Sequence, residues 1–131
     1  MEQFNLEFLD RVYRDGLEKY IQRLKSLGFV DGVFLDAGCG FGQWSLAASR
    51  LNTRVVGIDV SRERIEVAQE VALEKSIQNI VFDVQDLESI PYSKNFFDYI
   101  FSYSVLYMTN WRDSLKEMLR VVRGGGAYLH L

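Results

Sequence analysis

The sequence has 131 residues, of which 48% are hydrophobic and 25% are charged, and its formal net charge is −3. These values are typical of one soluble globular domain with its own core, and the negative charge argues against a broad nucleic-acid-binding surface. Cys39 is the only cysteine, which excludes an intrachain disulfide and fits a reducing compartment. Because the N-terminus lacks a basic signal-peptide region and no apolar run approaches the roughly 20 residues of a membrane span, we expect a cytoplasmic protein without a membrane partner.

The first 51 residues predict a helix, a strand and a second helix. Apolar residues at steps of three and four predict an amphipathic helix over 4–27, which Gly16 can divide in two and Gly28 ends. A short buried strand is expected at 33–35, and helix returns over 41–51. The apolar positions of the first helix are Phe4, Phe8, Val12, Leu17, Tyr20, Ile21, Leu24 and Leu27.

The rest of the sequence continues the alternation of strand and helix. Its strands are continuously apolar rather than alternating, which is the pattern of a parallel sheet covered on both faces. We therefore expect a doubly wound α/β fold in a single domain, residues 1–131, with a helical cap at 1–30 and the α/β core at 31–131. The strands are expected at 54–59, 80–82, 96–104 and 127–131, and the helices begin after the N-cap Ser61 and at Trp111.

A glycine-rich turn follows the first expected strand, with Asp36 at its head and Gly38, Gly40 and Gly42 at alternate positions. Glycines there allow either a close ligand approach or a tight strand-to-helix turn. Asp59, at the end of the second strand, lies 21 positions after Gly38 (59 − 38). That is close to the spacing at which an acid accepts hydrogen bonds from both ribose hydroxyls. A nucleoside-containing ligand is therefore expected.

The turn departs from the dinucleotide-binding pattern. Counted from Gly38, the third small position of G-x-G-x-x-G falls on Gln43, which is long and polar. Asp36 would repel a pyrophosphate and attract an ammonium group, although it could instead tie the turn by hydrogen bonds. The pattern favours a nucleoside joined to a cationic amino acid and disfavours a nicotinamide-dependent oxidoreductase.

The motifs resemble those of the class I, Rossmann-like S-adenosylmethionine-dependent methyltransferases, and the resemblance extends from about Val33 onward. It implies that S-adenosyl-L-methionine is the cofactor and S-adenosyl-L-homocysteine its product. The stretches that carry it are VFLDAGCGFG, VVGIDVS, DLESIPY, FFDYIFSYSVLY and LKEMLRVVRGGGAYLHL, in the family's order.

The resemblance also implies roles for individual residues. The first motif would hold the methionine part of the cofactor, Asp59 its ribose, and Val60 its adenine. Asp86 and Leu87 would contact the adenine edge, and the fourth strand would border the methionine end and the acceptor. The cofactor-binding residues expected on this basis are Asp36, Ala37, Gly38, Cys39, Gly40, Asp59, Val60, Asp86, Leu87 and Ser102.

Two features of this sequence differ from the family pattern. Gly124 stands where the family usually has proline, which loosens the last turn. The family sheet has seven strands in the order 3-2-1-4-5-7-6, whereas this sequence stops at the fifth and so looks truncated. Because an unpaired apolar edge is a liability, we expect either a second copy of the chain or a missing C-terminal segment to cover strand five.

The expected activity is methyl transfer to a small-molecule acceptor, and the sequence marks no metal site and no general base. Tyr103, Tyr107 and Tyr13 could border the acceptor or cofactor, but core or rim packing is the simpler interpretation, as a structural role is for His130. The alternative from another class is a truncated, non-catalytic module that binds the cofactor or acts through its open edge.

Overall fold

A computed structural model describes residues 7, 10, 16–103 and 110–130, and its centre is one five-stranded parallel sheet. The strand order is β3-β2-β1-β4-β5, and all four neighbouring pairs are parallel. This confirms the doubly wound α/β prediction and the expected order of the first five strands. The strands are β1 (Val33–Ala37), β2 (Arg54–Asp59), β3 (Ile80–Val84), β4 (Tyr99–Tyr103) and β5 (Ala127–His130).

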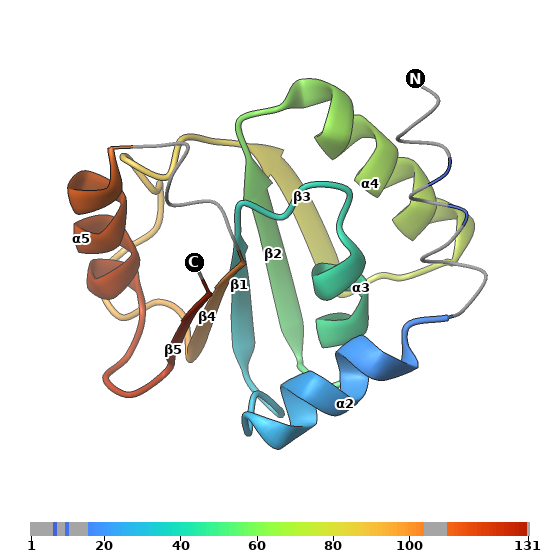
Figure 1. The fold of residues 1–131 in the computed structure, drawn as a ribbon, viewed down its shortest axis with the longest axis horizontal. Coiled ribbons are helices and arrows are strands. Elements are labelled where there is room, and N and C mark those ends of the chain that lie inside the picture. Colours follow the sequence, from blue (N-terminus) through green and yellow to red (C-terminus); the bar gives the residue numbers. More distant parts are fainter. Residues whose placement is uncertain (1–6, 8–9, 11–15, 104–109, 131) are drawn as a thin grey trace.

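Helices cover both faces of the sheet. Three helices, α2 (Glu18–Ser26), α3 (Gln43–Ser49) and α4 (Arg62–Glu74), lie on one side, and α5 (Trp111–Val121) lies on the other (Figure 1). Each side has its own apolar cluster. Leu46 and Phe101 belong to the first, and Ile100 and Met118 to the second.

Local sequence signals explain several element ends. Ser61 caps α4, since its hydroxyl accepts a hydrogen bond from the Arg64 amide, and Gly28 follows α2 with φ +77°. Gly16 has φ +76° and precedes α2, and the division of the first predicted helix at Gly16 stays a prediction. The expected apolar positions Phe4, Phe8 and Val12, and Tyr13 and Tyr107, lie outside the described residues.

The predicted fourth strand was wrong at its start. We expected it from residue 96, but β4 begins at Tyr99. Phe97 instead forms an isolated parallel bridge with Val122, and the Asp98 carboxylate accepts a hydrogen bond from the Val33 amide at 2.9 Å. These contacts with β1 and with the end of α5 delay regular pairing by three residues.

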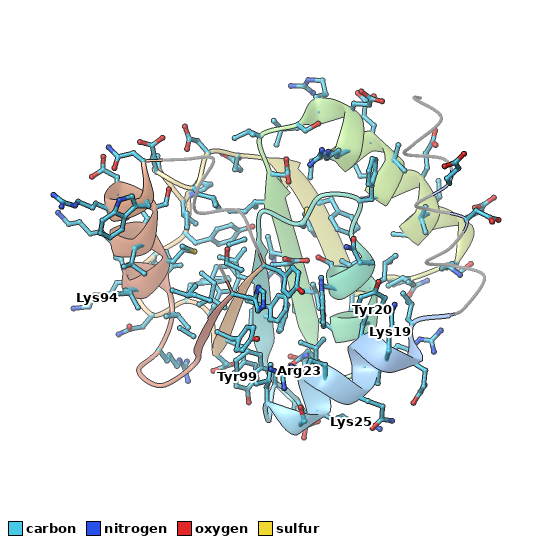
Figure 2. All side chains as sticks on the ribbon, viewed as in Figure 1. Lys19, Tyr20, Arg23, Lys25, Lys94 and Tyr99 are labelled. Carbon is cyan, nitrogen blue, oxygen red and sulfur yellow. The ribbon has the colours of Figure 1, made fainter. Side chains whose placement is uncertain are left out.

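Side chains of α2 contact both α3 and β5 on the first face of the sheet. Tyr20 packs edge-on against Trp44, with ring centroids 4.7 Å apart. Arg23 lies over the Tyr128 ring and donates a hydrogen bond to its hydroxyl at 3.2 Å. Both α2 residues are labelled in Figure 2. The helical cap over 1–30 and its boundary with the core stay a prediction.

Within the described residues, β5 pairs with β4 and with no other strand. Cover for that edge, by a second copy or a further segment, stays a prediction. None of the helices in the described part of the chain has the length and apolar character needed to cross a membrane.

Candidate active site

Several backbone amides of the loop between β1 and α3 donate hydrogen bonds to other atoms of the protein. The amides of Gly38 and Cys39 both donate to the carbonyl of Ile58 at 2.8 Å, and the Gly40 amide donates to Asp59 Oδ2 at 2.9 Å. A pyrophosphate needs free N–H groups in such a loop. The N–H groups of Gly38, Cys39 and Gly40 are already paired within the protein, so none of these three is free to bind a phosphate.

Gly40 and Gly42 have different structural roles in this loop. A Cβ on Gly42 would lie 2.8 Å from the Phe82 ring and 3.1 Å from Ala68 Cβ, so Gly42 serves the packing of α3 on the sheet. A Cβ on Gly40 would meet nothing within 4 Å, and both residues have positive φ. Gly40 therefore borders open space, which is the geometry required for close approach by a ligand.

Asp59 ends β2 and is buried, with both carboxylate oxygens engaged. Oδ2 accepts from the Gly40 amide, and Oδ1 accepts from the Ser61 amide at 2.8 Å. Each oxygen has a second lone pair, so the carboxylate can also accept from hydroxyls. Asp59 thus ties the glycine loop to the start of α4, and its expected contact with a ribose stays a prediction.

Asp36 is buried beneath the loop, and Ser45 of α3 donates a hydrogen bond to its Oδ2 at 2.7 Å. Burial raises the pKa of the Asp36 carboxyl to about 7, with a further rise from Asp59, while the Ser45 hydrogen bond opposes the change. Burial also raises the pKa of the Cys39 thiol, and both acids add to that effect. A cation beside the loop would interact favourably with the ionised form of either acid. The hydrogen bond from Ser45 is the structural role that the sequence also allowed for Asp36. A contact between Asp36 and an ammonium group stays a prediction.

Among the described residues, two buried polar side-chain atoms near these strand ends have no hydrogen-bond partner. They are the Gln43 side-chain carbonyl oxygen, at the start of α3, and the Ser102 hydroxyl, in β4, whose residue is 1% exposed. An unpaired buried polar atom costs free energy and calls for an explanation such as a ligand. Sequence reasoning included Ser102 but used Gln43 only as an argument against a dinucleotide.

The residues expected around adenine differ in what they can offer. Val60, directly after Asp59, is 64% exposed, so an apolar surface is available there. Leu87 is buried in the core, so only its backbone could face a ligand. Asp86 is exposed and accepts a hydrogen bond from the Glu88 amide at 2.8 Å, which organises the turn after β3. Ala37 closes β1 and is buried.

A clamp from α5 holds the segment after that turn, and sequence reasoning missed it. Arg120 donates to the carbonyls of Ile90 and Tyr92, both at 2.8 Å, and Glu117 accepts from the Ile90 amide at 2.9 Å. Arg120 also pairs with Glu117 and thereby lowers the pKa of that carboxyl. The sequence signal was Arg120 itself, the first residue of the R-V-V-R-G-G-G stretch.

Comparison with known proteins identifies the family. The Methyltransferase domain family matches residues 34–126. The chain belongs to the class I S-adenosylmethionine-dependent methyltransferases. The match includes the glycine loop, Asp59, the turn at Asp86 and the Arg120 clamp.

Individual methyltransferases match in sequence and in fold. The chain is 33% identical over 127 residues to the uncharacterized methyltransferase YcgJ of Bacillus subtilis, covering 90% of this chain and 49% of that protein. The crystal structure of YcgJ superposes with a TM-score of 0.77 at 28% identity, over 83% of this chain and 48% of the other. The demethylmenaquinone methyltransferase of Anoxybacillus flavithermus is 30% identical, over 70% of this chain and 40% of that protein. A SAM-dependent methyltransferase from Aquifex aeolicus shares the fold, with a TM-score of 0.79 at 24% identity, over 94% and 68% of the two chains.

The chain spans between 34% and 49% of the length of the curated methyltransferases it matches. The described residues hold the glycine loop and the ends of all five strands. In that part of the chain, no three histidine, cysteine, aspartate or glutamate side chains come together as metal ligands.

Proposed function

We propose that this methyltransferase domain binds S-adenosylmethionine and transfers its methyl group to a small-molecule acceptor. Family membership supports the donor and the reaction. The name of the demethylmenaquinone methyltransferase supports a small-molecule acceptor, since that relative acts on one. The acidic character of the chain gives a nucleic-acid acceptor no support.

The proposal rests on two observations. The loop amides donate hydrogen bonds within the protein, and two acids lie buried beside the loop. Gly38, Cys39 and Gly40 donate their N–H groups to β2, and the carboxyl groups of Asp36 and Asp59, buried nearby, are stabilised in their charged form by a cation. The site therefore suits an amino-acid ammonium group and opposes a pyrophosphate. This also separates the proposal from a nicotinamide-dependent oxidoreductase.

In the proposed complex, each residue contacts a particular part of S-adenosylmethionine. The carbonyl groups of the glycine loop and Asp36 hold the ammonium group, and Asp59 accepts from the ribose hydroxyls. Val60 covers one face of the adenine, and the backbone at Leu87, with Asp86, meets its edge. The unpaired Ser102 hydroxyl and Gln43 carbonyl oxygen gain partners from the methionine part.

The bound cofactor supplies a methyl group already activated on a sulfonium. The chain has then to align the acceptor with that carbon and to exclude water, which together account for several powers of ten in rate. No nucleophilic side chain is required, and a general base is needed only for an acceptor that must lose a proton.

Isothermal titration calorimetry with S-adenosylhomocysteine and with NAD⁺ tests the proposal. We expect saturable binding of S-adenosylhomocysteine and none of NAD⁺. Binding of NAD⁺ alone, or of neither ligand, overturns the proposal. Radiolabelled S-adenosylmethionine with a panel of small acceptors then tests transfer, and binding without transfer to any acceptor favours the non-catalytic module.

A further inference from the structure

Three aromatic rings stand together at the carboxyl ends of β4 and β5, next to the glycine loop. Tyr103 and His130 are cross-strand partners, with ring centroids 4.3 Å apart and planes 14° apart. Trp44, in the first turn of α3, lies on the other side of Tyr103 at 5.6 Å and 34°. We call Trp44, Tyr103 and His130 the aromatic floor.

Tyr103 and His130 stack on each other across neighbouring strands. Neighbouring strands lie about 4.8 Å apart, and the Tyr103–His130 ring separation of 4.3 Å is similar to that spacing. The rings are therefore stacked along the hydrogen-bonding direction and stand up from the sheet.

These two rings are open to solvent, unlike the row of rings beneath them. Tyr103 is 43% exposed although it has an aromatic neighbour on each side, and His130 is exposed too. Phe101, two residues earlier in β4 and stacked on Tyr128, is fully buried. Exposed apolar surface of this kind commonly marks a ligand site.

The aromatic floor lies beside the proposed cofactor site. Asp36 of β1 is in register with Phe101 of β4. Gly38 and Tyr103 each follow one member of that pair by two residues, Gly38 in the glycine loop and Tyr103 at the end of β4. Trp44 follows the last glycine of the loop by two positions. A molecule on the floor would meet the methionine end of a cofactor held by that loop.

We propose that the aromatic floor binds the planar aromatic ring of the methyl acceptor. This rests on the proposed function and narrows its acceptor to a flat aromatic compound. Aromatic rings prefer offset-stacked or edge-to-face contacts, which the exposed parts of Tyr103 and His130 can offer to a flat ring. The three side chains already pack on one another, so little conformational freedom is lost on binding.

His130 provides the reporter, because it is the only histidine in the chain and its imidazole C–H signals are unique in proton NMR. The full chain, saturated with S-adenosylhomocysteine, is titrated with 2-naphthol and with decahydro-2-naphthol, which has the same skeleton but no aromatic plane. We expect a saturable upfield shift of the His130 signals with 2-naphthol alone. Tyr103→Leu should weaken 2-naphthol about three- to tenfold, Tyr103→Phe should retain the affinity, and Trp111→Leu, on the opposite face, should not change it.

The two proposals fail in different ways. If S-adenosylhomocysteine binds but 2-naphthol gives no saturable shift, or decahydro-2-naphthol shifts the signals equally, the aromatic floor is not an acceptor site. Unchanged 2-naphthol affinity in Tyr103→Leu also rules out that acceptor site, and the wild-type comparison decides even where that variant fails to fold. Absence of S-adenosylhomocysteine binding overturns the proposed function and the acceptor role with it.

Discussion

The Gly40 amide donates a hydrogen bond to the Asp59 carboxylate at 2.9 Å, which fixes the glycine loop of β1 to the end of β2. The same carboxylate accepts from the Ser61 amide and so fixes the start of α4. One acid therefore fixes both the glycine loop and the start of α4. A change at Asp59 would therefore disturb the glycine loop as well as the expected contact with the ribose.

Asp59→Asn tests this coupling. A carboxamide has one acceptor oxygen and an NH₂ group, so it cannot accept from both the Gly40 and Ser61 amides. Loss of a charge-assisted hydrogen bond costs about 1.5–3 kcal/mol, so we expect S-adenosylhomocysteine to bind at least tenfold more weakly in calorimetry. Asp113→Asn removes the same charge from an exposed position on α5 and should bind normally. Equal affinity of both variants would show that Asp59 has no part in binding.

Gly40→Ala and Gly42→Ala form a matched pair. Both glycines have positive φ, so each alanine costs about 1 kcal/mol in backbone strain. At Gly42 the new methyl group also collides with Phe82, so we expect this variant to be the less stable by a further 1–3 kcal/mol or so in urea unfolding. At Gly40 the methyl group enters open space, so the loss should fall on S-adenosylhomocysteine affinity. Normal S-adenosylhomocysteine affinity in Gly40→Ala would show that the ligand does not occupy that space.

Much of the fold followed from the sequence because its signals are local. The apolar runs gave β2 with its observed bounds, and Ser61 and Gly28 marked helix ends by their backbone preferences. The start of β4 was missed since it depends on contacts of Phe97 and Asp98 with distant segments. Such pairings have no local signature.

The candidate site was predictable in its positions but not in its hydrogen bonds. Glycine and acid spacing located the loop and Asp59. The tie from Ser45 to Asp36 and the unpaired oxygen of Gln43 depend on how α3 docks on the sheet. The burial of Leu87 depends in the same way on the packing of the second apolar cluster.

Arg120→Ala should loosen the segment after β3. Arg120 holds the carbonyls of Ile90 and Tyr92 and orients Glu117, which accepts from the Ile90 amide. We expect hydrogen exchange at the Ile90 amide to accelerate at least tenfold. Arg123→Ala is the control, since Arg123 is mostly exposed and pairs with Asp98 instead. Exchange that stays slow in Arg120→Ala would mean that other contacts hold this segment.

Asp36 should make the stability of the ligand-free protein fall between pH 4 and pH 7. Burial raises the pKa of its carboxyl from 3.8 to about 7, so in that range the folded state keeps a proton that the unfolded state releases. Stability is therefore greatest below the unfolded pKa, declines as the pH rises through the interval, and levels off above about 7. A shift of roughly three units corresponds to at most about 4 kcal/mol. Asp36→Asn can still accept from Ser45 but cannot ionise.

Urea unfolding of the wild type and Asp36→Asn at pH 4.5, 6 and 8 measures this effect, because other titrating groups cancel in the difference. We expect the variant to gain stability relative to the wild type as the pH rises. An ammonium group beside Asp36 favours its charged form, so saturating S-adenosylhomocysteine should reduce the pH dependence of the wild type and leave that of Asp36→Asn nearly unchanged. Parallel curves for the two proteins without ligand would contradict the prediction, because they would show that folding does not raise the pKa of Asp36 into this range.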